Sequence, residues 1–458
     1  GVELVDFSQR HKSVTVNNFI DDSKPVLSTG TVAAGWDGGG YAYSTFSIIT
    51  RADYSYRYRY FLGASFREDR SSRFSPEHRT GDFWSVSAAW RITNEEWMKW
   101  ATKVLNNVKS KASYGYNGTV PNRYYQWRTL YTGSGAYDDS QALSQSFRPT
   151  YDLTWEKNRI WNVGVDAVLF GNRIKLTAEY YQRKSYDLIQ EVPVSHVTGY
   201  SSILTNTSAG IFNRGFELDL NASVLSVGAF KWDLGFNLAT LKATYYGLEQ
   251  DIIGGGQIKR NGESVHAWYM YDFAGINPNN GATTFWAPDR YGDKVHSSSE
   301  NPSHRMVVGK GVPTVTGAIN TNFTFMGISL SALFTYGLGH DVYDSRAASR
   351  TCIDGKTITY NIDVRQLDAW TPDNLYATAP LRMNGSVSSG TSTRFLYDGD
   401  YLKLKNIALS YTFPARTFRK IGVSGATVFA QAENLYVWTE LDGYDPDLQS
   451  NSSISVAK

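Results

Sequence analysis

Strict alternation of apolar and polar side chains is the feature that most constrains the fold of this chain. In residues 51–68, RADYSYRYRYFLGASFRE, the even positions from Ala52 onward are Ala, Tyr, Tyr, Tyr, Tyr, Leu, Ala and Phe, whereas the odd positions are largely polar and cationic. A period of two places alternate side chains on opposite faces of a β-strand, so this segment is predicted to be extended. The same period recurs at 83–92, 159–170, 173–184, 214–224, 230–240, 328–338, 401–413 and 426–436.

Composition does not decide whether the apolar face of these strands meets a protein core or lipid. Aromatic residues make up 14% of the 458 residues and charged residues 19%, which favours strands over helices. No apolar run is long enough for a membrane-spanning helix, and the mean hydropathy is −0.37. Barrel strands are half polar and give weak hydropathy, so a membrane barrel stays open beside a soluble antiparallel sheet.

Charge, cysteine content and the chain ends narrow the class further. The net charge of +2 gives no indication of nucleic-acid binding. Cys352 is the single cysteine, so no internal disulfide is expected. The first residues, GVELVDFSQRHK, do not have the pattern of a signal peptide, and the last, NSSISVAK, end in polar sequence without a strand. Both ends are therefore expected to be cut from a longer chain.

A hairpin centred on residues 57–59 would keep the apolar face on one side. A turn of three residues pairs Tyr56 with Tyr60 and Tyr54 with Leu62. The tyrosines then cluster near the turn, where aromatic girdles meet the boundary between lipid and water. The tyrosine face is predicted to meet lipid, and the polar face to line a wet interior. The residues predicted to point outward are Ala52, Tyr54, Leu62, Ala64, Trp84, Val86 and Trp90.

The connections between strands are predicted to alternate between long and short. Long ones are expected near 9–40, 69–82, 117–148, 189–210, 245–308, 340–396 and from about 438. Short ones are expected near 57–59, 93–100, 171–172, 226–229, 326–327 and 414–424, with a short helical turn at 94–100. An outer-membrane β-barrel has this asymmetry, with long extracellular loops and short periplasmic turns, whereas compact soluble domains rarely have so many long loops.

Several segments, in order along the chain, resemble the SusC/RagA-like branch of TonB-dependent outer-membrane transporters. FLGASFREDRSSRFSPEHRTGDFWSVSAAWRIT (61–93) is similar to a loop and strand of that family, and LTWEKNRIWNVGVDAVLFGNRIKLTAEYYQRKSYDLI (153–189) to one of its strand pairs. NRGFELDL (213–220) matches a further strand element. DGDYLKLKNIALSYTFP (398–414) and AENLYVWTELDGYDPDL (432–448) match most closely.

The resemblance implies an all-β fold: an antiparallel transmembrane barrel of 22 strands with an N-terminal plug. About twelve or thirteen strands are expected in this chain, so residues 1–458 would be a partial barrel, without the plug and the final strand. The resemblance further implies import of oligosaccharides or peptides across the outer membrane of a Gram-negative bacterium. The implied partners are a SusD-like surface lipoprotein lying over the extracellular mouth, TonB reached through the missing N-terminal region, and the lipid bilayer with its lipopolysaccharide.

Aromatic residues of the long loops are the candidate solute-binding residues, because aromatic faces stack on sugar rings and accept peptide side chains. The candidates are Tyr125, Trp127, Tyr269, Trp286 and Trp370. The alternative for each of them is packing of loop against loop. Neither a catalytic constellation nor a spacing typical of a metal or cofactor site is present in the sequence, so an enzyme is not expected.

Two other classes of protein stay open. A secreted soluble polysaccharide-binding protein or glycoside hydrolase would share the aromatic loops but not the ordered long and short connections. A porin or adhesin barrel would lack the link to an energising partner. For the solute, an oligosaccharide is preferred to a peptide mainly because of the resemblance, since Trp and Tyr serve both.

Overall fold

The computed structural model divides the chain into two compact units, which are described separately. The first contains Gly1–Ala88, Ser113–Trp161 and Lys184–Gly210, and the second contains Ala89–Ala112, Asn162–Arg183 and Ile211–Lys458. The structure describes residues 1–19, 30–137, 140–288, 294–297, 301–351, 363–381, 390–414, 416–417, 422–441 and 445–446.

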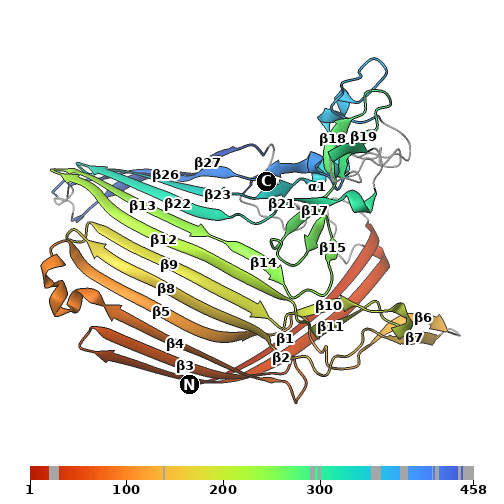
Figure 1. Ribbon diagram of the computed structural model, residues 1–458, viewed down its shortest axis with the longest axis horizontal. Helices are drawn as coiled ribbons and strands as arrows, with labels where there is room; N and C mark the ends of the chain where they lie inside the picture. The colour runs from red at the N-terminus through yellow and green to blue at the C-terminus, as the bar shows by residue number, and fades with distance from the viewer. Residues whose placement is uncertain are drawn as a thin grey trace. The chain divides into compact units, whose positions relative to one another are not determined.

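One large antiparallel sheet of 14 strands dominates the chain (Figure 1). Its hydrogen-bonded order is β1-β2-β3-β4-β5-β8-β9-β12-β13-β22-β23-β26-β27, and β14 pairs with β12. The strands are β1 (Val2–Phe19), β2 (Gly30–Tyr56), β3 (Tyr60–Ser71), β4 (Thr80–Arg91), β5 (Leu105–Thr119), β8 (Glu156–Leu169), β9 (Ile174–Tyr186), β12 (Gly210–Val227), β13 (Phe230–Thr240), β14 (Lys242–Tyr246), β22 (Val315–Phe325), β23 (Ile328–Leu338), β26 (Tyr401–Thr412) and β27 (Thr427–Thr439). The predicted all-β antiparallel fold is confirmed. The hydrogen-bonded path contains 13 strands, against about twelve or thirteen predicted, and β14 brings the sheet to 14.

The first hairpin has the predicted register. Tyr56 lies opposite Tyr60 and Tyr54 opposite Leu62, across a turn in which Arg57 and Tyr58 adopt positive φ. The apolar face is exposed: Tyr54 is 60% and Leu62 56% exposed. The other residues predicted to point outward are exposed as well: Ala52, Ala64, Trp84, Val86 and Trp90.

The short turns in the second unit also lie where the sequence places them. Gly228 and Ala229 join β12 to β13, and Met326 and Gly327 join β22 to β23. Met326 and Gly327 both have positive φ, as a two-residue hairpin turn with right-handed strand twist requires. The connection around Gly171 extends over 170–173. The predicted helical turn is a 3-10 helix at Glu96–Ala101.

The prediction of a long loop at 9–40 is wrong for the residues that the structure describes. β1 continues to Phe19 and β2 begins at Gly30, with ladder pairs throughout and one irregularity at Thr15 and Val16. The ladder to β1 is continuous through the glycines of 38–40 and holds them extended. Residues 20–29 lie outside the described part of the chain.

The other long connections contain small sheets of their own. They pair β6 (Tyr131–Tyr137) with β7 (Ser140–Gln145), and β10 (Ile189–Pro193) with β11 (Ser202–Asn206). The second unit adds β15 (Ile252–Gly254), β16 (Gln257–Lys259), β17 (Ala267–Met270) and β21 (Met306–Lys310) in one sheet, β18 (Asp272–Ile276), β19 (Thr283–Pro288) and β20 (Lys294–Ser297) in another, and β24 (Asp341–Tyr343) with β25 (Leu396–Asp398).

Helices are short, and the described residues include none long and apolar enough to cross a membrane. The α-helix is α1 (Ser345–Thr351), and 3-10 helices besides Glu96–Ala101 lie at Ile92–Asn94, His196–Thr198, Pro302–His304, Val364–Asp368 and Thr393–Phe395.

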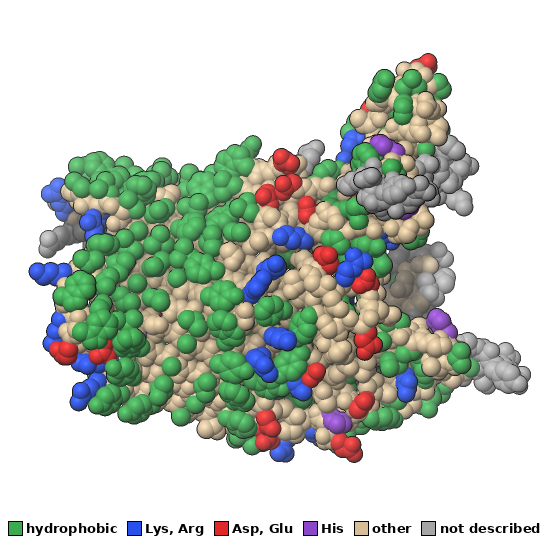
Figure 2. Space-filling model, in the orientation of Figure 1, with side chains coloured by type: hydrophobic (Ala, Val, Ile, Leu, Met, Phe, Trp, Pro, Cys, Tyr) green, Lys and Arg blue, Asp and Glu red, His purple; other side chains and the backbone are tan. Residues whose placement is uncertain are grey.

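Buried apolar clusters consist mainly of residues of the connections, with Phe83 of β4 among them, whereas the sheet exposes its apolar face. In the first unit Phe74, Phe83, Leu153 and Trp155 pack together, and in the second Phe395 packs with residues of α1. Figure 2 shows hydrophobic side chains gathered over the strands of the large sheet, toward the end at which the short turns lie. This distribution is inverted relative to a water-soluble sheet, because the exposed face of a soluble sheet is the polar one.

Candidate functional site

Tyr125 and Trp127 lie in a connection that covers an exposed edge of β2. The ladder between β2 and β3 ends where Thr45 pairs with Ser71, so the preceding residues of β2 have no neighbour from β3. There the Tyr125 hydroxyl accepts a hydrogen bond from the Ala42 N–H at 2.7 Å, and Trp127 Nε1 donates to the Ser72 carbonyl at 3.2 Å. Tyr125 thus pairs with the open edge of β2, and Trp127 ties the same loop to the residue that follows β3.

Arg73 ties the same loop to β2 through its guanidinium. Its Cζ atom lies 4.1 Å from the centre of the Tyr43 ring and 4.6 Å from that of Tyr124, so the cation is held between two aromatic faces. Nη1 donates to the Pro121 carbonyl at 2.9 Å and Nη2 to the Tyr124 hydroxyl at 3.4 Å. Arg73 therefore links the loop to β2 through two hydrogen bonds and two cation–π contacts.

Four rings form an array beside Arg73 that we call the aromatic wall: Phe7, Tyr41, Tyr43 and Tyr124. Tyr41 and Tyr124 stack with centroids 4.0 Å apart and planes at 22°. Phe7 lies 5.9 Å from Tyr41 and 5.3 Å from Tyr43, with planes at 27° and 28°. Tyr43 and Tyr124 are 5.9 Å apart at 28°.

The aromatic wall lies on the polar face of the sheet. Tyr41 and Tyr43 occupy odd positions of β2, as do Arg51 and Asp53, whereas the exposed apolar residues Ala52 and Tyr54 occupy even ones. Phe7 pairs with Tyr43 in the ladder and so shares its face. Sequence reasoning missed the wall because its candidates were limited to aromatic residues of the long loops, whereas Phe7, Tyr41 and Tyr43 lie in strands. The available signal was a pair of tyrosines two positions apart.

The other three candidates lie in the second unit. Tyr269 of β17 is half-buried, with the Arg260 guanidinium 5.4 Å from its ring centre. Trp286 of β19 is also half-buried and contacts the His296 ring at a centroid distance of 4.3 Å. Trp370 is only 9% exposed. The two indoles therefore differ in how much ring face they can offer a ligand.

Trp370 holds a turn of the chain in place. Its Nε1 donates to the Pro278 carbonyl at 3.0 Å, and its ring lies against Gly281, where an added Cβ would approach it to 2.7 Å. Gly281 has φ +70°, which an L side chain rarely adopts. The packing alternative considered for loop aromatics thus describes the contacts of Trp370 in this structure.

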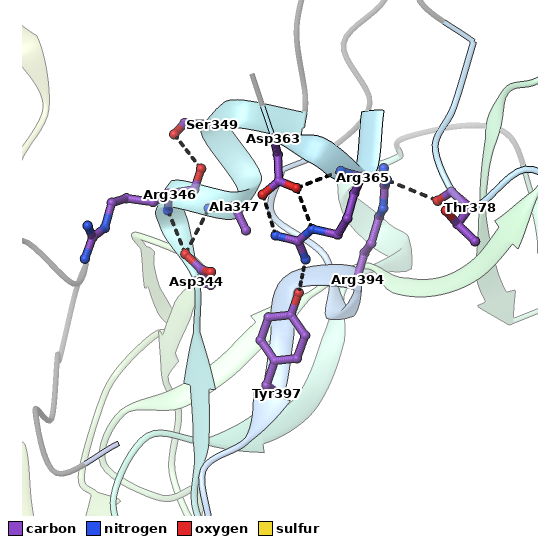
Figure 3. Close-up of polar contacts among 9 residues, drawn as sticks. All are labelled: Asp344, Arg346, Ala347, Ser349, Asp363, Arg365, Thr378, Arg394 and Tyr397. Atoms are coloured by element: carbon purple, nitrogen blue, oxygen red, sulfur yellow. Dashed lines mark hydrogen bonds and ion pairs between the residues drawn. The ribbon is translucent and has the colours of Figure 1, made fainter. Parts of the chain in front are cut away.

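A polar framework orders the same region (Figure 3). The Asp344 carboxylate accepts from the N–H groups of Arg346 and Ala347 at the start of α1, at 3.0 and 2.9 Å. Arg365 makes a two-pronged contact with Asp363, at 2.9 and 2.8 Å, and its Nη1 donates to the Tyr397 hydroxyl at 2.8 Å. The hydrogen bonds to Asp363 raise the pKa of Arg365. This framework supports a segment rich in exposed apolar side chains.

That segment forms what we call the 364–376 patch: Val364, Leu367, Leu375 and Tyr376. Leu367 is 82% and Tyr376 91% exposed. Large apolar side chains this exposed and this close in sequence mark a candidate contact surface.

The polar face of the large sheet carries ion pairs between its strands. In the second unit, Lys111 Nζ lies 3.1 Å from both Asp166 Oδ1 and Glu179 Oε2. A cleft of about 240 Å³ lies on the same face near the turn of 170–173, lined in part by Asn221, Asn320 and Asn322. Within the described residues, no group of three or more His, Cys, Asp or Glu side chains could hold a metal ion.

His340 stands out among the titratable groups outside the large sheet. It is 3% exposed, and both ring nitrogens lack a hydrogen-bond partner among the residues that the structure describes. Burial lowers the pKa of His340, although the carboxylates of Asp400, Asp341 and Asp398 act in the opposite direction. Burial also raises the pKa of Asp341.

Comparison with known proteins defines the class to which this sheet belongs. Residues 3–435 match the family described as TonB dependent receptor-like, beta-barrel, and the chain belongs to that family. The SusC/RagA-like resemblance of the sequence is thereby confirmed, and with it the barrel fold.

Particular relatives carry the comparison further. SusC of Bacteroides thetaiotaomicron, a TonB-dependent receptor, is 25% identical over 88% of this chain and 41% of its own length. A TonB-dependent receptor of Formosa agariphila is 25% identical over 94% of this chain and 46% of its own. The solved RagAB peptide transporter superposes with a TM-score of 0.86 at 26% identity, covering 98% of this chain and 50% of that one. The chain thus spans about half the length of these relatives.

These relatives are receptors and transporters and not enzymes. They support the prediction that the chain is not an enzyme and weigh against a secreted glycoside hydrolase.

Proposed function

We propose that this chain is part of a TonB-dependent importer that moves oligosaccharides across the outer membrane of a Gram-negative bacterium. The observation that carries the proposal is the inverted sheet: its apolar face is exposed, as at Tyr54 and Leu62, and its opposite face carries ion pairs such as Lys111 with Asp166. A membrane barrel with a wet interior requires this distribution. The family match supplies the class.

The remaining parts of the importer lie outside these 458 residues in this proposal. The chain covers 41–50% of the length of the relatives named above. We assign residues 1–458 to a partial barrel, with the plug, the TonB-contacting segment and the final strand contributed by other parts of the same protein. Energy would come from TonB in the periplasm, and the exposed apolar face would contact the bilayer and its lipopolysaccharide.

The solute is proposed to be an oligosaccharide. Tyr125, Trp127, Tyr269, Trp286 and Trp370 remain the candidate contacts, although the polar atoms of Tyr125 and Trp127 anchor their loop and Trp370 is buried. A peptide is the second candidate, because the structure superposes on a peptide transporter. Calorimetry of the intact full-length complex against a glycan panel and a peptide mixture tests the choice. Peptide binding without glycan binding would overturn it.

A SusD-like surface lipoprotein is the proposed partner, lying as a hinged lid over the long loops near 245–308 and 340–396. The 364–376 patch lies in the second of these loops and exposes the apolar area that such a contact would bury. In native membranes, Leu367→Ser combined with Tyr376→Ser should reduce recovery of the lipoprotein with the affinity-tagged barrel. Leu143→Ser, at an exposed leucine of β7 in the first unit, is the matched control. Undiminished recovery with the double variant would remove the patch from the interface.

A further inference from the structure

We propose that the aromatic wall is a binding subsite for neutral pyranose rings of the transported oligosaccharide. This inference rests on the proposed function and adds the place in the first unit at which the sugar is held. The wall consists of Phe7, Tyr41, Tyr43 and Tyr124, and none of them was among the residues predicted from sequence.

The position of the wall suits a transported ligand. Its rings lie on the polar face of the β1–β2 ladder, which the proposed barrel turns toward its interior. They also lie beyond the end of β3, on the side of the sheet opposite the short turn at 57–59. A solute entering from the long-loop end would therefore meet this surface early on its path.

The geometry of the rings suits the flat face of a sugar. The four rings of the wall are inclined to their neighbours by only 22–28°, so their faces run in similar directions. Tyr41 and Tyr124 cover one face of each other, and Arg73 lies against Tyr43 and Tyr124. Phe7, 39% exposed, is therefore the ring most open to a ligand, and the three tyrosines are half-buried behind it. The C–H-rich face of a pyranose ring can stack on such aromatic faces and bury area with few rotatable bonds.

The polar groups of the wall favour a neutral ligand. The Tyr41 hydroxyl donates to Gln9 Oε1 at 2.5 Å, and the Tyr124 hydroxyl accepts from Arg73. Arg73 donates from Nη1 to Pro121 and from Nη2 to Tyr124, and its guanidinium lies between the Tyr43 and Tyr124 rings. We commit to neutral saccharide rings because the wall itself consists of four uncharged aromatic side chains, and the acidic saccharides in the test below address the charge of Arg73.

The loop contacts hold the wall ready for binding. Arg73, Tyr125 and Trp127 fasten residues 121–128 to β2 and β3, and this places Tyr124 over Tyr41. Little side-chain freedom remains to be lost when a ligand binds, which improves affinity without an additional contact. Arg73 is thus a positioning residue and Phe7 a contact residue.

The test measures saccharide binding to the full-length barrel with its lipoprotein partner, using neutral hexasaccharides of glucose, xylose and mannose as probes. Phe7→Ala should weaken binding of the recognised hexasaccharide by about three- to tenfold, the range that one stacked ring accounts for. Phe7→Leu keeps an apolar side chain and should show most of the same loss. Tyr131→Ala, at an exposed tyrosine of β6 outside the wall, is the matched control and should bind like the wild type.

Positioning by Arg73 has a separate readout. Arg73→Lys keeps the charge but cannot donate to both the Pro121 carbonyl and the Tyr124 hydroxyl as the guanidinium does. The loop of residues 121–128 should therefore loosen, which should weaken saccharide binding and raise hydrogen exchange at the Ala42 N–H. Phe7→Leu should weaken binding without that change in exchange.

The outcomes separate this inference from the function on which it rests. If the wild type binds a hexasaccharide and both Phe7 variants bind it with the same affinity, the subsite is overturned. The proposed function then still stands. An equal loss in Tyr131→Ala also overturns the subsite. If the wild type binds acidic saccharides or peptides but no neutral saccharide, two claims are overturned together: the subsite, and the proposal that the solute is a neutral oligosaccharide. If Phe7→Ala does not assemble, Phe7→Leu decides the matter.

Discussion

Ala52 lies directly opposite Ala64 in the β2–β3 ladder, and both side chains are exposed on the apolar face. The neighbouring Ser65 points to the other face, where its hydroxyl lies 2.7 Å from that of Ser85. Adjacent residues of one strand thus face surroundings of opposite character, and substitutions at them should differ accordingly.

Ala64→Arg should destabilise the folded barrel by about 2–4 kcal/mol, because it places a cation on the face proposed to meet hydrocarbon. Ser65→Arg should cost at most about 1 kcal/mol, the worth of one hydrogen bond on a wet face. The measurement is reversible unfolding of the full-length protein in lipid bilayers. Equal costs at the two positions would show that the assigned facing is wrong.

Lys111→Met should lower the free energy of unfolding, because it removes both ion pairs that Lys111 makes with Asp166 and Glu179 on the polar face. Lys111 lies 3.1 Å from both Asp166 and Glu179, and all three side chains are partly exposed, so each pair should contribute at most about 1 kcal/mol. The loss should shrink in about 1 M salt, since these charges are screened. In a double-mutant cycle, Glu179→Gln should cost less in the Lys111→Met background than in the wild type. Strict additivity would mean that the pair contributes nothing.

Acidification should loosen the connection around His340. Burial lowers its folded-state pKa below the ordinary 6.5, so the unfolded or opened state binds more protons as the pH falls. The stability that neutral His340 contributes is complete above about pH 6.5 and is lost as the pH falls through the folded pKa. Hydrogen exchange at the Gly399 N–H, which donates to the His340 carbonyl at 2.9 Å, should accelerate over this range after correction for intrinsic rates.

His340→Leu supplies the control for that titration, because the variant has no imidazole to protonate and protection should stay level. Asp341 acts in the opposite direction, since its pKa is raised by burial and its protonation on further acidification is favourable. An identical pH dependence in the wild type and in His340→Leu would exclude His340 as the source.

Trp370→Ala should destabilise the connection that contains it by about 3–5 kcal/mol, as truncation of a buried tryptophan does. Gly281→Ala should act in the same direction, because its Cβ would lie 2.6 Å from Leu381 Cβ at a positive φ. Trp286→Ala, at a half-buried ring, is the milder control. Limited proteolysis of the assembled barrel reports each change. Loss of solute binding in Trp370→Ala at full protease resistance would instead assign Trp370 to the ligand.

The sequence by itself was sufficient for the pattern of the large sheet. Alternation of side chains and the parity of a turn are local properties, so the pairing of Tyr56 with Tyr60 and the exposed face of Tyr54 followed from a few adjacent residues. The Met326–Gly327 turn was equally local, since two residues with positive φ close a hairpin. The extent of β1 and β2 could not be predicted from local sequence, because a glycine-rich strand and a glycine-rich loop look alike until the partner strand is known.

The candidate site depended on contacts between residues distant in sequence. Tyr124 stacks on Tyr41 across 83 positions, and the same separation joins Tyr125 to Ala42. Aromatic composition marked the loop of Tyr125 and Trp127. It could not say that the Tyr125 hydroxyl pairs with the edge of β2, that Trp127 bonds to Ser72, or that Trp370 would be buried against Gly281. Local sequence determines which way a strand residue points, whereas the folded chain alone decides what comes to lie against it, because that choice is made by long-range packing and by the unpaired edges that loops must cover.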